Sequence, residues 1–137
     1  MKTLPQVAGD ETPLVRVDFS DDEAWHLLRR ALATPAKEGF IAYLHIVDDP
    51  AYRDLSPARI AALARQGERL VVVADEACLA SPELPLLALR IDERGRFDAL
   101  RVVASQLYAI ENNIALAHMD WAHFTRFADD DGVFRGF

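Results

Sequence analysis

Residues 70–75 read LVVVAD, an unbroken apolar run that ends in an aspartate, and this stretch decides the fold class. A strand without a polar position is typical of the centre of a sheet whose two faces are both covered by helices. Ahead of it in the chain, strand-like segments alternate with helical ones in the order strand, helix, strand, helix. This alternation predicts parallel pairing through crossover connections, and therefore an α/β fold.

The other predicted strands lie before and after this segment in the chain. A first strand begins at Leu14, where apolar and polar residues alternate, and a second covers 40–47, which is apolar at nearly every position. Two further strands, 85–91 and 97–103, are joined by 92–96, a connection with the length and the glycine of a hairpin loop. Antiparallel strands therefore complete a mixed sheet of about five strands.

Capping residues mark the helix boundaries. Ser20, followed three residues later by a glutamate, has the pattern of a capping box and starts a helix. Ser56 caps the next helix, and Gly67 closes it. Ser105 is expected to cap the last helical region, which breaks or kinks near Asp120. The sequence thus predicts about three or four helices.

The predicted domain organisation is a short leader followed by one domain. Residues 1–13 carry Pro5, Gly9 and Pro13 among polar neighbours, so we expect a flexible leader there. Residues 14–137 are expected to form a single α/β domain, because the chain has 137 residues, 51% of them hydrophobic, which is enough for one core.

The composition restricts the partners that the protein is expected to have. Against 15 Lys and Arg stand 22 Asp and Glu, a net charge of −7 that repels phosphates and favours basic partners, so nucleic acid is not an expected ligand. No apolar run approaches the roughly 18 residues of a membrane span, and we expect no membrane association. The single cysteine, Cys78, allows no internal disulfide and suits a reducing compartment, which indicates the cytoplasm.

Carboxylates follow each of the first three predicted strands. They are Asp18, Asp48, Asp49, Asp75 and Glu76. Because the carboxyl ends of parallel strands meet at one edge of an α/β sheet, where ligands bind, these side chains are expected to share that edge. Asp18, Asp48 and Asp75 would then suit a divalent cation such as Mg²⁺. The competing interpretation is that aspartates after strands cap helices and start turns, as Asp49 before a proline does.

The last helical region, SQLYAIENNIALAHMDW at 105–121, is apolar on two faces. On a helical wheel its main apolar stripe is bordered by Glu111 and His118, which are close enough to form a hydrogen-bonded pair. The opposite face should be polar, yet it carries an apolar strip with a single amide in it. This strip consists of Tyr108, Asn112, Leu116 and Met119. Either another part of the chain covers the strip, or it is presented to a partner.

Nothing in the sequence completes a catalytic or metal-binding set. The serines serve as predicted caps or lie in turns, and none occurs in a Gly-x-Ser-x-Gly turn. His118 and His123 are five positions apart, whereas metal ligands on one helical face are normally three or four apart. Cys78 has no basic neighbour that would stabilise a thiolate. We therefore expect no cofactor, unless the strand-end carboxylates hold Mg²⁺.

Several stretches resemble a known family. They are VRVDFSDDEAW, VDDPAYRDLSP, VVVAD, RVVASQLYAIENNIALAHMDW and DGVFRGF. From about Leu14 to Phe137 the chain resembles a family of small acidic bacterial proteins catalogued as a domain of unknown function, with IENN, MDW and FRGF as its most distinctive motifs. The resemblance implies a compact bacterial domain and marks a set of family residues without assigning them a role. They are Asp18, Asp48, Asp49, Pro50, Glu111, Asn112, Asn113, Asp120 and Phe137.

The leading functional hypothesis is a non-enzymatic acidic domain that binds a basic protein partner, most concretely an immunity or antitoxin protein. Its expected contact residues are Asp48, Asp49, Asp75, Glu76, Tyr108, Asn112 and Met119. An alternative is a Mg²⁺-dependent hydrolase or phosphotransfer enzyme for a small phosphorylated substrate, with Glu111 or His118 as acid or base. A further alternative is a structural or regulatory homo-oligomer, such as a homodimer, that pairs through the second face of the last helix.

Overall fold

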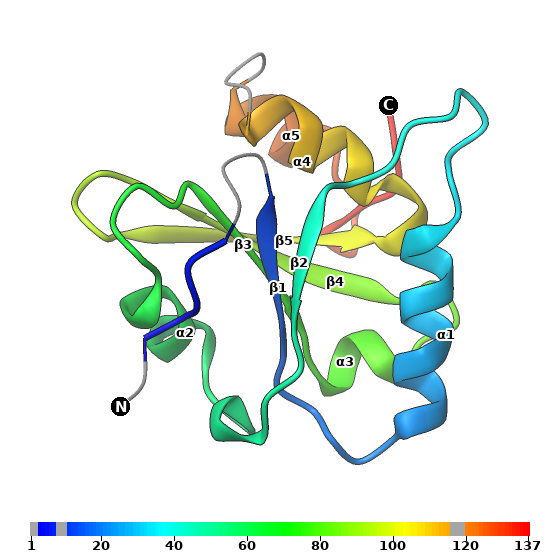
Figure 1. Cartoon of the computed structure of the whole chain (residues 1–137). Helices are drawn as coiled ribbons and strands as arrows, with labels where there is room; N and C mark the ends of the chain where they lie inside the picture. Colours follow the sequence, from blue (N-terminus) through cyan, green and yellow to red (C-terminus); the bar gives the residue numbers. More distant parts are fainter. Residues whose placement is uncertain (1–2, 8–10, 116–119) are drawn as a thin grey trace.

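The fold is built on one mixed sheet, seen in a computed structural model that describes residues 3–7, 11–115 and 120–137 (Figure 1). The sheet is six-stranded, in the order β2-β1-β3-β4-β5-β6. Its strands are β1 Thr12–Arg16, β2 Leu44–Val47, β3 Leu70–Ala74, β4 Pro85–Ile91, β5 Phe97–Val103 and β6 Val133–Phe134. β1 pairs in parallel with β2 and β3, while β3, β4 and β5 pair antiparallel. The predicted mixed α/β sheet is confirmed, and β6, parallel to β5, extends it.

Helices occur in each region where the sequence predicts one. They are α1 Asp22–Ala33, α2 Pro57–Leu63, α3 Glu76–Leu79, α4 Leu107–Ala115 and α5 Trp121–Arg126, with short 3-10 helices η1 Pro50–Tyr52 and η2 Ala104–Gln106. The last helical region is divided near Asp120, as predicted, because α5 starts directly after that residue. The helix α3 has no counterpart among the predicted helices, since a helix of this length is too short to show a 3.6-residue period.

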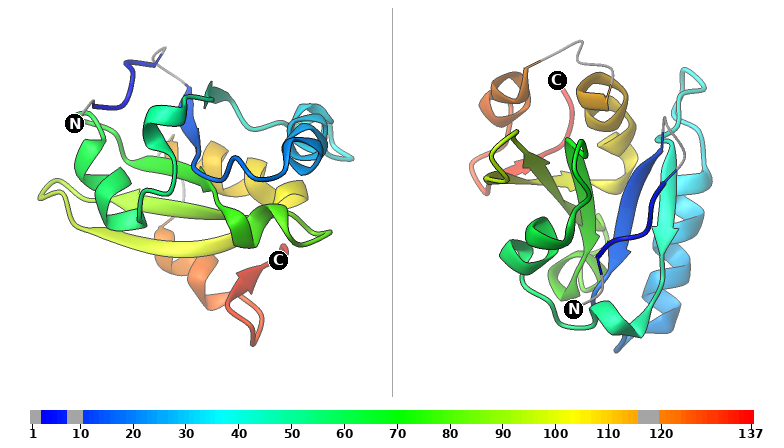
Figure 2. Two further views of the ribbon diagram at one scale, coloured as in Figure 1. Left: turned by 90° about the horizontal axis from the view of Figure 1, so that it is seen from below. Right: turned by 60° about the vertical axis from the view of Figure 1, so that its left-hand side comes forward.

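The core consists of two layers, one on each face of the sheet. Alternate residues of β3 enter different layers: Leu70 and Val72 pack with α1, α4 and α5, whereas Val71 and Val73 pack with α2 and the N-terminal segment. Figure 2 shows α1 and α2 on opposite sides of the central strands. The apolar run of β3 is therefore explained by burial on both faces, because all of its residues are buried.

The N-terminal segment is held more closely than its composition predicts. Leu4, expected in a flexible leader, is 1% exposed and packs in the second core layer. Its N–H donates to the carbonyl of Leu63, and the Tyr52 hydroxyl donates to the carbonyl of Thr3. β1 also begins at Thr12 rather than at Leu14. A single apolar anchor among polar residues leaves no periodic signal, so the composition of this segment does not reveal Leu4 as part of the core.

Some helix and strand ends also differ from the predicted ones. The N-cap of α1 is Asp21, which accepts the N–H of Ala24 at 3.0 Å, whereas the Ser20 hydroxyl donates to Asp18. Ser105 lies inside η2, where no side-chain cap is formed, and α2 ends at Leu63, before Gly67. β2 starts at Leu44, so residues 40–43 lead into the strand without belonging to it. In the described part of the chain, no helix is both long and apolar enough to cross a membrane.

Candidate functional site

Carboxylates gather at one end of the molecule, where β1, β2 and β3 end and α1 and α3 begin (lower part of Figure 1). We call this surface the acidic end. It consists of Asp18, Asp21, Asp22, Glu23, Asp48, Asp49, Asp54, Asp75 and Glu76. The parallel pairing of the first three strands brings these residues together, as the sequence predicts.

A buried arginine lies beneath part of the acidic end. Arg16, at the end of β1, is 4% exposed, and its guanidinium donates to Asp22 at 2.6 Å and to Asp48 at 3.4 Å. Its Nε donates to the carbonyl of Asp18, and the guanidinium lies 4.4 Å from the centroid of the Phe19 ring. The hydrogen bond from Arg16 lowers the pKa of Asp22. Arg16 thus ties the ends of two strands to the start of α1.

Asp75 is engaged by a second arginine from a distant strand. Both carboxylate oxygens of Asp75 accept from Arg101 of β5 at 2.7 Å, and the same carboxylate caps α3 through the N–H of Cys78 at 3.1 Å. Burial raises the pKa of Asp75, but the hydrogen bonds and charge of Arg101 together with the amide bond outweigh it, so the pKa is lowered. Asp75 is therefore an ionised structural residue.

Capping explains several of the predicted site residues. Asp49 accepts the N–H of Ala51 at the start of η1, as Asp21 and Asp75 do for α1 and α3. In the described ranges no group of three His, Cys, Asp or Glu could hold a metal ion. Asp18, Asp48 and Asp75 are the metal ligands considered from the sequence. They lie at the same end of the sheet but do not form such a group.

Other carboxylates of the acidic end have no such partner. Glu23, Asp54 and Glu76 are exposed, and none of them forms an ion pair with a described residue. They belong to the same end of the molecule as the paired carboxylates and add negative charge to it. The arginines that hold this end together, Arg16 and Arg101, are the residues that sequence reasoning missed. Arg16 binds Asp22 six positions away and Asp48 32 positions away, and Arg101 binds Asp75 26 positions away, so helix or strand periodicity does not reveal these contacts.

Residues 40–43 cover the second face of the last helical region along α4. The Asn112 amide donates to the carbonyl of Ile41 at 3.1 Å, and the Tyr108 ring is stacked on Phe40 with 6.3 Å between the ring centroids. Tyr108 and Asn112 are thus half-buried under residues 40–43. Within this covering segment, Phe40 and Tyr43 are 56% and 52% exposed. Leu116, His118 and Met119 lie outside the described residues.

Glu111 is buried rather than placed at a surface site. It is 1% exposed, and its carboxylate accepts the N–H of Tyr43 at 2.5 Å and the hydroxyl of Thr12 at 3.4 Å. Asn113 donates to the carbonyl of Ala109 in its own helix. The polar triplet in the middle of α4 therefore serves local and tertiary hydrogen bonding, and no described contact of Glu111 points to acid or base chemistry.

Comparison with known proteins gives a family match. The family model described as Domain of unknown function (DUF6924) matches residues 11–137. The match includes every strand of the sheet, from β1 to β6, and all residues of the acidic end. No curated protein matches the chain.

Proposed function

The chain belongs to the family described as Domain of unknown function (DUF6924), a membership that brings no activity with it, and we propose that it is a non-enzymatic domain whose acidic end binds a basic protein partner. The most concrete form is an immunity or antitoxin protein that inhibits a basic toxin in the bacterial cytoplasm. The observation that carries this proposal is the set of exposed carboxylates without a described cation partner, Glu23, Asp54 and Glu76, at the same end as the arginine-held carboxylates.

The charge distribution favours recognition of a cationic surface. With a net charge of −7, the chain attracts basic proteins over a distance of about a Debye length, roughly 8–10 Å at physiological salt. Complementary charge raises association rates and rejects partners of the wrong sign. Arg16 and the N-terminal caps hold the backbone under this surface in place, so a partner would meet carboxylates whose positions are already fixed.

The protonation behaviour of this end gives no support to a general-acid role. The pKa values of Asp22 and Asp75 are lowered, which keeps both residues ionised near neutral pH. A general acid at neutral pH needs the opposite shift. The nearby Cys78 thiol is buried, and burial raises its pKa to about 12, which suppresses its reactivity as a nucleophile.

Charge reversal at the acidic end provides the test. In Glu23→Lys/Glu76→Lys, two exposed side chains of this surface change sign, whereas the control Glu38→Lys/Asp130→Lys makes the same net change on exposed residues elsewhere. The wild-type chain and both variants are used as bait in the native host, with quantitative mass spectrometry. We expect one basic protein to be enriched by wild type and control but lost with the acidic-end variant.

The purified partner then allows a quantitative measurement. Stopped-flow association should slow by about 10-fold or more for the acidic-end variant, and the wild-type rate should fall steeply with added salt. The proposal is wrong if no basic protein is recovered, or if the two variants associate at the same rate.

A further inference from the structure

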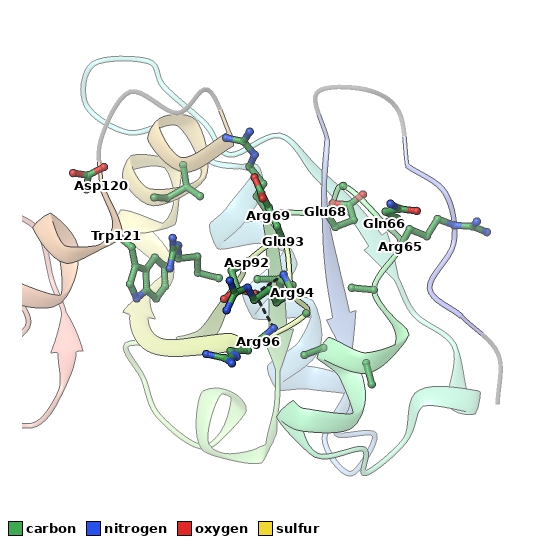
Figure 3. A pocket seen from close by; sticks show the side chains of 18 residues that line it. Arg65, Gln66, Glu68, Arg69, Asp92, Glu93, Arg94, Arg96, Asp120 and Trp121 are labelled. Carbon is green, nitrogen blue, oxygen red and sulfur yellow. Dashed lines mark hydrogen bonds between the residues drawn. The ribbon is translucent and has the colours of Figure 1, made fainter.

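An open pocket of about 980 Å³ lies at the other end of β3 from the acidic end, and arginines line it (Figure 3). Its walls come from the loop between α2 and β3, the β4–β5 hairpin and the start of α5. The arginines are Arg65, Arg69, Arg90, Arg94 and Arg96. In a chain with a net charge of −7, five guanidinium groups thus line one pocket, together with the four carboxylates of Glu68, Asp92, Glu93 and Asp120.

The arginines of this pocket differ in what they bind. The Arg65 Nε donates to the carbonyl of Leu4 at 2.9 Å, and in Figure 3 this side chain extends away from Arg94 and Arg96. Arg90 lies 3.9 Å from Asp98. Within the described ranges, the guanidinium groups of Arg69, Arg94 and Arg96 form neither an ion pair nor a hydrogen bond.

Three arginines elsewhere in the described structure bind carboxylates, and their side chains are more buried than those of the pocket arginines, all of which are exposed. Arg16 and Arg101 bind aspartates at the acidic end, and Arg135 binds Glu83, Asp129 and Asp131. The pocket also contains carboxylates, but no described one forms an ion pair with Arg69, Arg94 or Arg96. Three exposed guanidinium groups that line one pocket in this way are suited to an acceptor supplied by a ligand.

The hairpin holds its arginines in place through the backbone. The Asp92 carboxylate accepts the N–H groups of Arg94 and Arg96, both at 2.9 Å, and Gly95 between them has a φ of +79°, which glycine adopts without strain. The Asp92 carboxylate is therefore engaged by the backbone of the turn. It fixes the two positions from which the guanidinium groups extend, and a substitution of either side chain leaves these backbone bonds intact.

We propose that this pocket binds a small anion with one or two phosphate or carboxylate groups, and that Arg69, Arg94 and Arg96 are its guanidinium partners. A guanidinium offers paired N–H donors that match two oxygens of a carboxylate or phosphate. Trp121, 8% exposed, gives the pocket an aromatic wall. The volume suits a small-molecule ligand. This site is separate from the proposed protein-binding surface.

The carboxylates of the pocket limit the kind of anion. Glu68 and Glu93 also line it, and both would repel an extended polyanion. Burial raises the pKa of Glu68, as expected for a carboxylate that no arginine stabilises. The charge balance therefore excludes nucleic acid as the occupant and favours a ligand with few negative charges.

Nuclear magnetic resonance with two simple probes tests the proposal. The ¹⁵N-labelled chain is titrated with pyrophosphate, as a phosphate source, and with succinate, as a carboxylate source, at constant ionic strength. We expect saturable shifts of the Arg69, Arg94 and Arg96 amides and of the Trp121 indole N–H, with the amides of Asp75 and Glu76 unchanged. Tighter binding of pyrophosphate would indicate a phosphorylated ligand, and tighter binding of succinate a carboxylic acid.

Matched variants separate a site from general charge attraction. Arg69→Gln and Arg96→Gln should each weaken binding about 10-fold or more, because each removes charge-assisted hydrogen bonds. Arg29→Gln, an exposed residue of α1 outside the pocket, removes the same charge and should leave the affinity within about 2-fold. The proposal is overturned if neither probe gives saturable shifts up to about 10 mM, or if Arg29→Gln weakens binding as much as the pocket variants.

Discussion

The carboxylate of Glu111, in α4, accepts the backbone N–H of Tyr43 at 2.5 Å and so joins a helix late in the chain to the residues that lead into β2. Residues 40–43 lie outside the sheet, so their backbone groups need other partners. The Glu111 carboxylate accepts the N–H of Tyr43, and the Asn112 amide donates to the carbonyl of Ile41. The polar pair in α4 thereby fixes the segment that covers the second face of its own helix.

Glu111 is therefore expected to be a stability residue. Glu111→Leu should lower the free energy of unfolding by about 1–3 kcal/mol, because it removes a buried acceptor and leaves the Tyr43 N–H without one. Glu111→Gln keeps an oxygen for that N–H and should cost less. Urea unfolding measures both, with Asn113→Ala as the control, since Asn113 bonds only within its helix among its described contacts. Equal losses for Glu111→Leu and Asn113→Ala would contradict this role.

The contact between Asp75 and Arg101 should be separable from the helix cap on the same carboxylate. Asp75→Asn retains an acceptor for the Cys78 N–H and loses the ion pair, whereas Asp75→Ala loses both. The cap is worth about 1 kcal/mol, and the pair about 1 kcal/mol more, because side chains about a quarter exposed are partly screened by water. A double-mutant cycle of Asp75→Asn with Arg101→Gln should give a coupling energy of about 1 kcal/mol, and a coupling of zero would refute the assignment.

The parts of the fold with strong local patterns could be predicted to the residue. β3, β4 and β5 have the predicted bounds. The ends of β3 are marked by the polar residues around its apolar run, and the facing ends of β4 and β5 by the glycine-containing loop between them. The start of β2 could not be predicted from residues 40–47, since the whole run is apolar but only Leu44–Val47 pairs with β1. The first half of the run packs against α4, about 70 positions later, and sequence periodicity does not report such a contact.

The candidate site shows the same division. The shared edge of the strand-end carboxylates follows from parallel order, and that expectation holds for Asp48 and Asp75. The charge state of this edge depends on Arg16 and Arg101. In the sequence, both arginines are polar residues in strands where polar and apolar residues alternate, which predicts an exposed side chain rather than an ion pair. The arginine pocket was missed for a related reason: its residues come from separate loops, and the net charge of the chain has the opposite sign.

The pair of Asp75 and Arg101 also predicts a pH dependence. The pKa of Asp75 is lower in the folded than in the unfolded chain, so its ionised form adds stability above the unfolded value of about 3.9. That contribution is lost as the pH falls through the folded pKa. The stability difference between wild type and Asp75→Asn should therefore be constant from pH 7 to about pH 5 and shrink toward pH 3 in urea titrations. A difference that grows on acidification would exclude this origin.

Cys78 should react only when the chain opens. The residue is fully buried, and burial, together with the charge of Asp75, raises the pKa of its thiol to about 12, so very little thiolate exists at pH 8. Alkylation by iodoacetamide, followed by mass spectrometry, should be slower in the native chain than in urea by a factor of about 100 or more. Asp75→Ala should accelerate native labelling, because it removes the cap of α3 and with it part of the cost of local opening. Asp75→Asn keeps the cap and should label more slowly than Asp75→Ala. Native labelling as fast as in urea would show that α3 does not shield this thiol.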